Sequence, residues 1–211
     1  MEIQILTDRS SWFFNNQDKT PIRFRKYLKK NLISDHHKIK DNYDLTIIIS
    51  YYKIIPKKFL LRSKHNLVIH ESNLPKGRGM SPLYWQILKG ETKVIFTLFE
   101  CSQKMDEGRY YFKRSFHFRP TLLFEEIKKK QLKYAFDMVD IFLKKYKKKK
   151  NLISYPQKNK PTYFPKILPT LSEINIDKSI KSQINKIRTR DNENYPAYFF
   201  YKKRKYIIKI F

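Results

Sequence analysis

Short apolar runs alternate with longer polar or amphipathic stretches along the first seventy residues. Three runs are rich in β-branched residues: IQIL at 3–6, DLTIIISYY at 44–52 and NLVIH at 66–70. Nearly continuous apolar character over so few residues is typical of strands that are covered on both faces. Between the first two runs, RFRKYLKKNLI at 23–33 places its apolar residues three and four positions apart, which predicts a helix. The alternation predicts an α/β fold with a central, mostly parallel sheet flanked by helices.

The middle of the chain continues the pattern with a short helix and two further strands. SPLYWQILKG at 81–90 offers Ser81 as a helix N-cap, Pro82 at the first helical position and Gly90 as a stop. The runs 93–100 and 109–118 read as strands joined by a hairpin-like connection that Gly108 closes. After Pro120, apolar residues recur near every 3.6 positions and predict a long amphipathic helix over the sheet.

Composition changes after the lysine-rich run at 144–150. Residues 151–176 contain four prolines and no helical period, so we expect an extended segment that wraps the surface. KSIKSQINKIRTRDN at 178–192 predicts a helix, and AYFFYKKRKYIIKIF at 197–211 predicts two strands around a basic turn. We therefore expect two parts: a main domain over residues 1–150, and an extended segment with a small helix and β-hairpin appendage over 151–211.

Length and composition limit the class of protein. A chain of 211 residues with 41% hydrophobic content can bury a core of its own. No stretch approaches the ~20 apolar residues of a membrane helix, so we expect a cytoplasmic protein without a membrane partner. The single cysteine, Cys101, excludes an internal disulfide and a cysteine-based zinc site, and we expect no metal site.

The net charge of +27 is large enough to suggest an anionic partner. The chain is also rich in Lys, Asn, Ile, Tyr and Phe, the profile of an AT-rich coding sequence in which lysine fills solvent positions. The basic runs at 144–150 and 202–205 fit solvated helix ends and turns. Charge alone therefore does not establish nucleic acid as a partner, although an anionic substrate would be favoured.

All four glycines lie between residues 77 and 108, close after the strand predicted at 66–70. If that strand is parallel, His70 lies at the carboxyl edge of the sheet, where α/β proteins bind ligands. Ser72, Leu74 and the turn formed by Gly77 and Gly79 would let backbone N–H groups approach a ligand. A structural role for a lone histidine remains the alternative.

Asp106, two residues before Gly108, is the second candidate for chemistry. An aspartate there also suits an ordinary turn. The connection between two strands could nevertheless return its carboxylate to the edge that holds His70, and a His–Asp pair is suited to proton transfer.

The stretch from 66 to 108 resembles the 10-formyltetrahydrofolate-dependent formyltransferase family. It contains the family's His-x-Ser-x-Leu-Pro segment, a glycine-bearing turn, a Pro-x-x-Trp helix, a Gly-x-Thr region and a late Asp-x-Gly. The likeness extends to LTDRSSWF near the start, YYKIIP at 51–56 and PTYFPK at 161–166, which resemble the shorter branch that formylates amino sugars on nucleotides.

The resemblance implies a Rossmann-like formyltransferase fold, 10-formyltetrahydrofolate as cofactor, and His70 and Asp106 as catalytic residues. The family's third catalytic residue is an Asn two positions before the His, and here it is Val68. Backbone N–H groups or Asn73 would have to support the oxyanion instead. The cofactor-binding residues that the resemblance implies are Ile54, Ile55, Pro56, Ser72, Leu74, Gly77 and Gly79, although the three apolar positions equally suit a core.

Among the family's substrates, the resemblance favours a nucleotide-linked amino sugar. The methionyl-tRNA enzymes carry a separate C-terminal barrel, whereas this chain shows a short hairpin. Arg188, Tyr195 and Phe199 are candidates for holding the nucleotide, with hairpin packing as the alternative role. A homodimer is also expected. Two other functions stay open: formylation of another amine such as methionyl-tRNA, and a decayed scaffold that binds nucleic acid.

Overall fold

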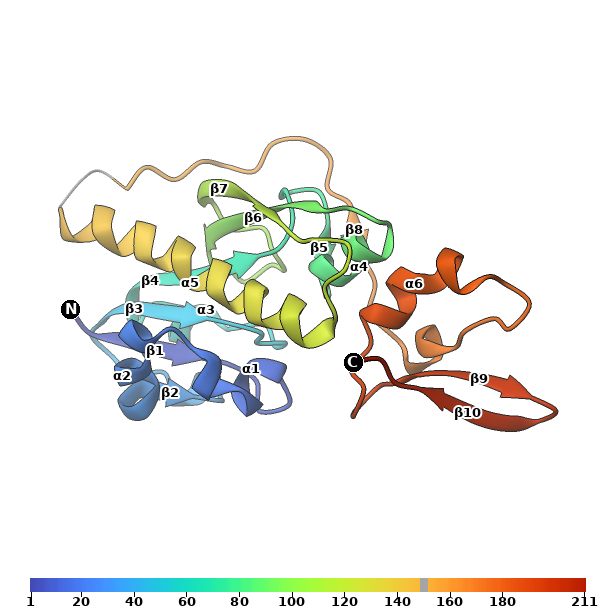
Figure 1. Ribbon diagram of the computed structural model, residues 1–211. Helices are drawn as coiled ribbons and strands as arrows, with labels where there is room; N and C mark the ends of the chain where they lie inside the picture. The colour runs from blue at the N-terminus through green and yellow to red at the C-terminus, as the bar shows by residue number, and fades with distance from the viewer. Residues whose placement is uncertain (149–151) are drawn as a thin grey trace.

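The computed structural model describes residues 1–148 and 152–211 (Figure 1). Six strands form one sheet in the order β2-β1-β3-β4-β6-β7. The first four are parallel, and β6 and β7 run antiparallel, so the predicted mostly parallel α/β sheet is confirmed. The strands are β1 (Ile3–Leu6), β2 (Leu32–Ile33), β3 (Tyr43–Ile48), β4 (Ser63–His70), β6 (Lys93–Glu100) and β7 (Tyr110–His117).

Helices cover the sheet because its strands are apolar on both faces. The long helix predicted after Pro120 is α5 (Phe124–Lys147), which crosses the sheet in Figure 1. Its buried side chains, among them Phe136 and Phe142, pack against Ile5, Ile47 and Leu67 of three neighbouring strands. The other helices of this part are α1 (Trp12–Asn15), α2 (Ile22–Asn31), α3 (Lys57–Leu60) and α4 (Pro82–Leu88), with 3-10 turns η1 (Gln17–Lys19) and η2 (His36–Lys38).

A second, smaller apolar cluster contains the side chains that alternate with those facing α5. It consists of Leu6, Ile33, Ile39, Ile48, Ile55 and Phe59, with Val68 packed against it. Because side chains alternate along a strand, Val68 and His70 of β4 project on this side of the sheet, whereas Leu67 and Ile69 project toward α5. The side chain of His70 therefore emerges on the face that α5 does not cover.

The ends of α4 test the predicted capping residues. The helix starts at Pro82, and Gly90, with φ +86°, follows its last turn as expected. Ser81 is the N-cap residue, as predicted. Its backbone angles are left-handed (φ +51°), and its hydroxyl makes no capping hydrogen bond.

The C-terminal elements lie beside the sheet rather than in it. β8 (Tyr163–Phe164) pairs in parallel with β5 (Arg78–Gly79), so the proline-rich segment is not wholly irregular. It continues through η3 (Pro169–Ser172) to α6 (Ile180–Arg188) and the hairpin of β9 (Ala197–Tyr201) and β10 (Arg204–Ile208), which projects outward in Figure 1. The helix and hairpin match the prediction, whereas the domain boundary expected at 150/151 falls outside the described residues.

The lysine-rich run expected at a solvated helix end is described as far as Lys148, and α5 ends there at Lys147. Residues 149 and 150 of that run lie outside the described residues. Over the described ranges, no helix is both long enough and apolar enough to cross a bilayer.

Candidate active site

His70 is the last residue of β4, at the carboxyl edge of the parallel part of the sheet. Its side chain is 8% exposed. The ring Nε2 lies 2.8 Å from the carbonyl oxygen of Gly77, and Nδ1 lies 3.7 Å from Oδ1 of Asp106. A carbonyl and a carboxylate only accept hydrogen bonds, so both ring nitrogens face acceptors.

Asp106 reaches His70 from the loop between β6 and β7, as the sequence predicts. Its backbone is left-handed, with φ +53°, and the second carboxylate oxygen, Oδ2, accepts the N–H of Gly79 at 2.9 Å. The carboxylate is thus held between a ring and a backbone amide that come from different segments. The structure brings together the two residues expected to carry the chemistry.

Close approach of β8 explains why Gly77 and Gly79 are glycines. Both have positive φ (+74° and +97°), and a Cβ at Gly79 would lie 2.4 Å from the carbonyl oxygen of Phe164. A Cβ at Gly77 would lie 2.6 Å from the Phe164 ring. Only residues without a side chain fit here.

The N–H groups of this turn, which were expected to approach a ligand, are paired within the chain in this structure. The N–H of Gly77 donates to Oγ1 of Thr162 at 2.8 Å, and that of Gly79 donates to Asp106. The turn therefore holds Thr162 and the carboxylate rather than presenting two free donors. A direct contact of these glycines with the cofactor stays a prediction.

A buried network behind Asp106 was not expected from the sequence. Arg78, between the two glycines, donates to Glu107 at 2.7 Å and to the side-chain oxygen of Gln157 at 2.9 Å. The amide nitrogen of Gln157 donates to the carbonyls of Asp106 and Gly108, at 2.7 and 2.9 Å. Gln157 thus ties the extended segment to both the glycine turn and the Asp106 loop. No periodic signal in its proline-rich surroundings marks it.

The two residues considered for the oxyanion occupy different environments. Val68 projects from β4 on the same side as His70, and its neighbours are the apolar residues of the second cluster. Asn73 is exposed, and its side-chain oxygen accepts from Lys113 at 2.7 Å. Among the hydrogen bonds of the described residues, none joins Asn73 to His70.

The apolar candidates for cofactor binding divide by exposure. Ile55 is 2% exposed within the second cluster, which fits the core role that was kept as its alternative. Leu74 is fully buried, and its contact with the cofactor stays a prediction. Ile54 is 52% exposed, and Pro56 is exposed at the start of α3. Ser72 is buried, and its hydroxyl has no hydrogen-bond partner within the described part of the chain.

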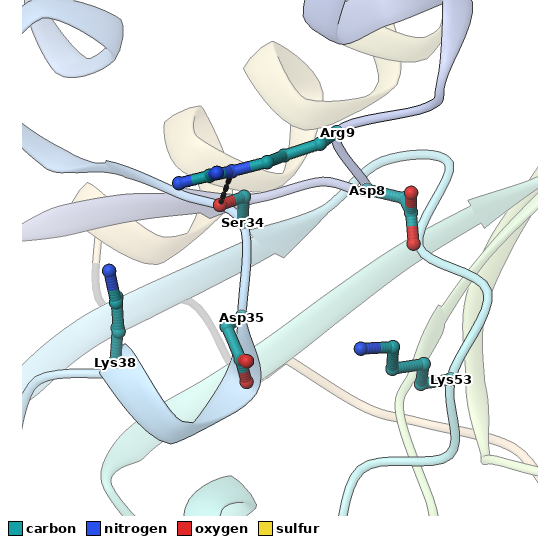
Figure 2. Close-up of a pocket in the computed structure, with 6 residues that line it drawn as sticks. All are labelled: Asp8, Arg9, Ser34, Asp35, Lys38 and Lys53. Atoms are coloured by element: carbon teal, nitrogen blue, oxygen red, sulfur yellow. Dashed lines mark hydrogen bonds between the residues drawn. The ribbon is translucent and has the colours of Figure 1, made fainter.

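An open cleft lies beyond the carboxyl ends of β1, β2 and β3. It has a volume of about 360 Å³ (Figure 2), and it is lined by Asp8, Arg9, Ser34, Asp35, Lys38 and Lys53. The sequence did not reveal it, because its walls come from three separate segments that follow β1, β2 and β3. The guanidinium of Arg9 is fixed by a 3.0 Å hydrogen bond from Nε to Oγ of Ser34.

Histidines beside the cleft form a compact group with Asp35. Asp35, His36 and His37 each offer an atom that could bind a metal, all within 4.8 Å of one another. Asp35 Oδ1 already accepts from the backbone and ring of His37, which lowers the Asp35 pKa to about 2, and Nδ1 of His36 pairs with the Tyr51 hydroxyl at 2.7 Å. Most of the ligand atoms are therefore already paired.

The three candidates for nucleotide binding lie in the C-terminal elements. Arg188 is 4% exposed and donates to the carbonyl of Leu122 at 2.8 Å, and burial lowers its pKa. Phe199 stacks on Tyr206 within the hairpin, at 5.2 Å between ring centroids. Both contacts fit the packing role kept as the alternative. Tyr195 is 59% exposed, and no described contact joins any of the three to His70.

Comparison with known proteins identifies the family of this chain. A family model described as formyl transferase matches residues 18–138, which include β4, the glycine turn and Asp106. The chain belongs to the formyl transferase family. It is 30% identical over 152 residues to methionyl-tRNA formyltransferase of Thermotoga neapolitana, covering 72% of this chain and 49% of that protein. The chain thus spans about half the length of such relatives.

Several solved structures share the fold. Methionyl-tRNA formyltransferase from Clostridium thermocellum superposes with a TM-score of 0.75 at 24% identity, covering 97% of this chain and 90% of that one. A 4-N formyltransferase from Francisella tularensis gives 0.71 at 17% identity, covering 99% and 96%. HypX from Aquifex aeolicus, solved with tetrahydrofolic acid, gives 0.69 at 19% identity, covering 97% and 36%. At these identities the likeness establishes the fold.

Proposed function

We propose that this formyltransferase transfers the formyl group of 10-formyltetrahydrofolate to the amine of a nucleotide-linked amino sugar. The observation that carries the proposal is the pairing of His70 with Asp106 at the carboxyl edge of the sheet. Membership of the family supports formyl transfer, and HypX, a structural neighbour, was solved with tetrahydrofolic acid. A sugar N-formyltransferase from Shewanella, which is also among the structural neighbours, supports a sugar acceptor.

The chemistry follows from what each residue can do at this edge. The acceptor amine attacks the formyl carbon, a C–N bond forms, and the carbonyl oxygen becomes an oxyanion. The imidazolium of His70 stabilises that charge, which requires its Nε2–H to turn from the Gly77 carbonyl toward the substrate. Asp106 holds the ring and accepts the proton that the amine releases, directly or through water. The bond from the formyl carbon to N10 then breaks, and N10 takes up a proton.

Formylation of methionyl-tRNA is the second candidate function. Relatives named methionyl-tRNA formyltransferase match 72% of this chain, and the charge of +27 would attract RNA. The sugar acceptor is preferred because YYKIIP at 51–56 and PTYFPK at 161–166 resemble the sugar-directed branch. The homodimer and the cytoplasmic location expected from the sequence stay predictions.

A rate assay with defined acceptors tests the proposal. Release of tetrahydrofolate would be followed with 10-formyltetrahydrofolate and a panel of nucleotide-linked 3-amino and 4-amino sugars, with methionyl-tRNA in parallel. We expect turnover with one sugar nucleotide. We expect His70→Asn to lose this turnover, because asparagine is polar like histidine but carries no charge. Turnover with the tRNA alone would select the second function. Absence of folate binding, together with salt-sensitive RNA binding, would contradict both.

A further inference from the structure

The hairpin of β9 and β10 buries one face and leaves the other open. Ala197 and Phe199 of β9 pack in a small core with Ile187 of α6. Because side chains alternate along a strand and paired residues share a face, the residues between them project away from that core. This outer face consists of Tyr198, Phe200, Lys205 and Ile207. Phe200 is 48% exposed and the hairpin projects outward in Figure 1, so no described element covers this face.

The positive charge of the hairpin is not balanced by acidic residues. Residues 197–211 contain five lysines and arginines and no aspartate or glutamate. Within the described part of the chain, only Lys209 among the five has an ion-pair partner, Glu193 at 2.9 Å. The other four are consecutive and exposed at 202–205. Such a cluster attracts an anionic partner, whereas a second copy of this chain would bring the same charge to the same place.

The turn at the tip holds lysines where its backbone favours other residues. Lys202 and Lys203 both have positive φ, +46° and +64°. A two-residue turn with this backbone favours Asn-Gly, because most side chains are unfavourable in the left-handed region. At the other positive-φ positions of the described chain that are not glycine, the residues are Asn, Asp or Ser. A coding bias toward lysine would supply asparagine equally well, since the chain is rich in both. Neither the turn nor the composition explains these two lysines, which points to a function for their charge.

Exposed rings lie next to the cations of the hairpin. The Nζ of Lys205 lies 4.0 Å from the ring centroid of Tyr198, and that of Lys202 lies 5.6 Å from the ring centroid of Tyr201, which is 50% exposed. Rings and cations in alternation suit single-stranded nucleic acid, in which bases stack and phosphates pair with lysine or arginine. An anionic membrane fits less well, because its interface takes up apolar side chains and the tip of this hairpin is formed by Lys202 and Lys203.

We propose that the β9–β10 hairpin is a docking element for single-stranded nucleic acid. The four cations at 202–205 pair with its phosphates, and Phe200 and Tyr201 stack on its bases. Backbone phosphates and stacked bases occur in every sequence, so this surface has no sequence preference. The inference goes beyond formyl transfer and does not depend on the acceptor, because no ion pair or hydrogen bond of the described residues joins 200–205 to His70 or Asp106.

Fluorescence anisotropy of a labelled oligouridylate of about twelve nucleotides, titrated with the full chain, tests the proposal. If the four cations neutralise four phosphates, the affinity should fall about 50-fold between about 50 mM and about 200 mM salt. Lys202→Asn/Lys203→Gly removes two of the charges and gives the turn the residues that its backbone favours. We expect this variant to lower the slope of log Kd against log salt by about 1.4, with an equal or higher melting temperature.

The matched charge control is Lys29→Gln/Lys30→Gln, at two adjacent exposed lysines of α2. It makes the same change in net charge away from the hairpin, so we expect a much smaller change in the slope.

Substitutions of Phe200 test the stacking part of the proposal. Phe200→Leu keeps an apolar side chain without a ring, and we expect about tenfold weaker binding of the oligonucleotide at every salt concentration. Phe200→Tyr keeps the ring and should bind as the native chain does.

Three results would overturn the inference. One is an equal change of slope in the hairpin variant and in the α2 control, which would indicate a general effect of charge. Another is binding to phosphatidylserine vesicles without binding to the oligonucleotide, which would assign the hairpin to a membrane surface. The third is a dimer, detected by sedimentation, that Phe200→Leu dissociates while oligonucleotide binding is unchanged, which would assign the outer face to a second copy. The rate assay with sugar nucleotides tests the proposed function separately, because it contains no oligonucleotide.

Discussion

The carboxylate of Asp106 lies between the ring of His70 and the backbone amide of Gly79. One oxygen is 3.7 Å from Nδ1 of His70, and the other accepts the Gly79 N–H at 2.9 Å. The backbone amide therefore fixes the carboxylate in an orientation that faces the ring. Nε2 of His70 faces a second acceptor, the Gly77 carbonyl, so the ring lies between two oxygen atoms from different segments.

Asp106→Asn should lower kcat/KM by about 100-fold or more, since the amide keeps the shape but can neither hold an imidazolium nor take the amine proton. Its side-chain oxygen can still accept the Gly79 N–H, so we expect the melting temperature to change little. Steady-state kinetics and a thermal melt check both statements. Asp177→Asn, at an exposed position, is the control. Near-native kcat/KM in Asp106→Asn would remove Asp106 from the mechanism.

Gln157 should act as a positioning residue for Asp106. Gln157→Ala removes two hydrogen bonds to the Asp106 loop and leaves a buried nitrogen of Arg78 without its partner. We expect a loss of about 1–3 kcal/mol of stability. We also expect roughly a tenfold fall in kcat with KM for the acceptor nearly unchanged.

Gln157→Glu separates positioning from bulk stability. It keeps an acceptor for Arg78 but loses the donor to the two carbonyls of the loop. If the positioning role is correct, Gln157→Glu is more stable than Gln157→Ala but has the same low kcat. Full kcat in Gln157→Ala would show that the loop holds Asp106 without the extended segment.

Local sequence signals predicted the parts of the site that lie on regular elements. The apolar run at 66–70 placed His70 at the strand end, and the turn chemistry around Gly108 placed Asp106 in a loop at the same edge. Such signals depend on neighbours in the chain, which the sequence displays directly.

Long-range pairing explains what the sequence did not reveal. Gln157 reaches Asp106 across 51 positions, from a segment with no period, and Thr162 reaches Gly77 across 85. The pairing of the glycine turn with β8 could not be predicted, because β8 is only two residues long. A positive φ could be predicted from the glycines alone. The neighbouring strand β8, which leaves no room for a Cβ, could not.

Gly79→Ala should destabilise the protein strongly. The new Cβ would lie 2.4 Å from a backbone oxygen of Phe164, and φ is +97°, so both the close contact and the left-handed backbone are unfavourable. We expect about 3 kcal/mol or more in a denaturant titration, with loss of activity. At Gly90 the φ of +86° is similar but the nearest atom is 3.7 Å away, so Gly90→Ala should cost only about 1 kcal/mol. Equal losses would show that β8 does not press on the turn.

Asp44 should make stability depend on acid pH. Its pKa is lowered to about 2, first by the hydrogen bond from Lys64 and also by the backbone N–H of Glu2 and the hydroxyl of Tyr146. Because the folded-state pKa lies below the usual 3.8, the stabilisation is complete above about pH 4 and is lost as pH falls toward 2. Melts of the native chain and Asp44→Asn at pH 6 and pH 2.5 should differ by ~1 kcal/mol at the higher pH and converge at the lower. A constant difference would contradict this.

Val68→Asn tests directly how the site manages without the family's asparagine. Val68 shares a strand face with His70, so an amide there would project toward the same edge and could donate to the oxyanion. We expect kcat to rise about tenfold, and stability to fall by about 1–3 kcal/mol, because a polar group would enter an apolar cluster. Val68→Ala is the control: it disturbs the cluster without adding a donor, so it should lose stability and gain no rate.

Asn73→Ala completes the comparison. If Asn73 supplies the missing donor, its loss should lower kcat in the native chain and should matter less once Val68→Asn is present. If Lys113 holds it away from the chemistry, kcat stays unchanged in both backgrounds. A Val68→Asn variant that is destabilised without any gain in kcat would mean that the oxyanion is already supported fully by His70. The departure from the family pattern would then be a substitution in the apolar cluster and not a deficit in catalysis.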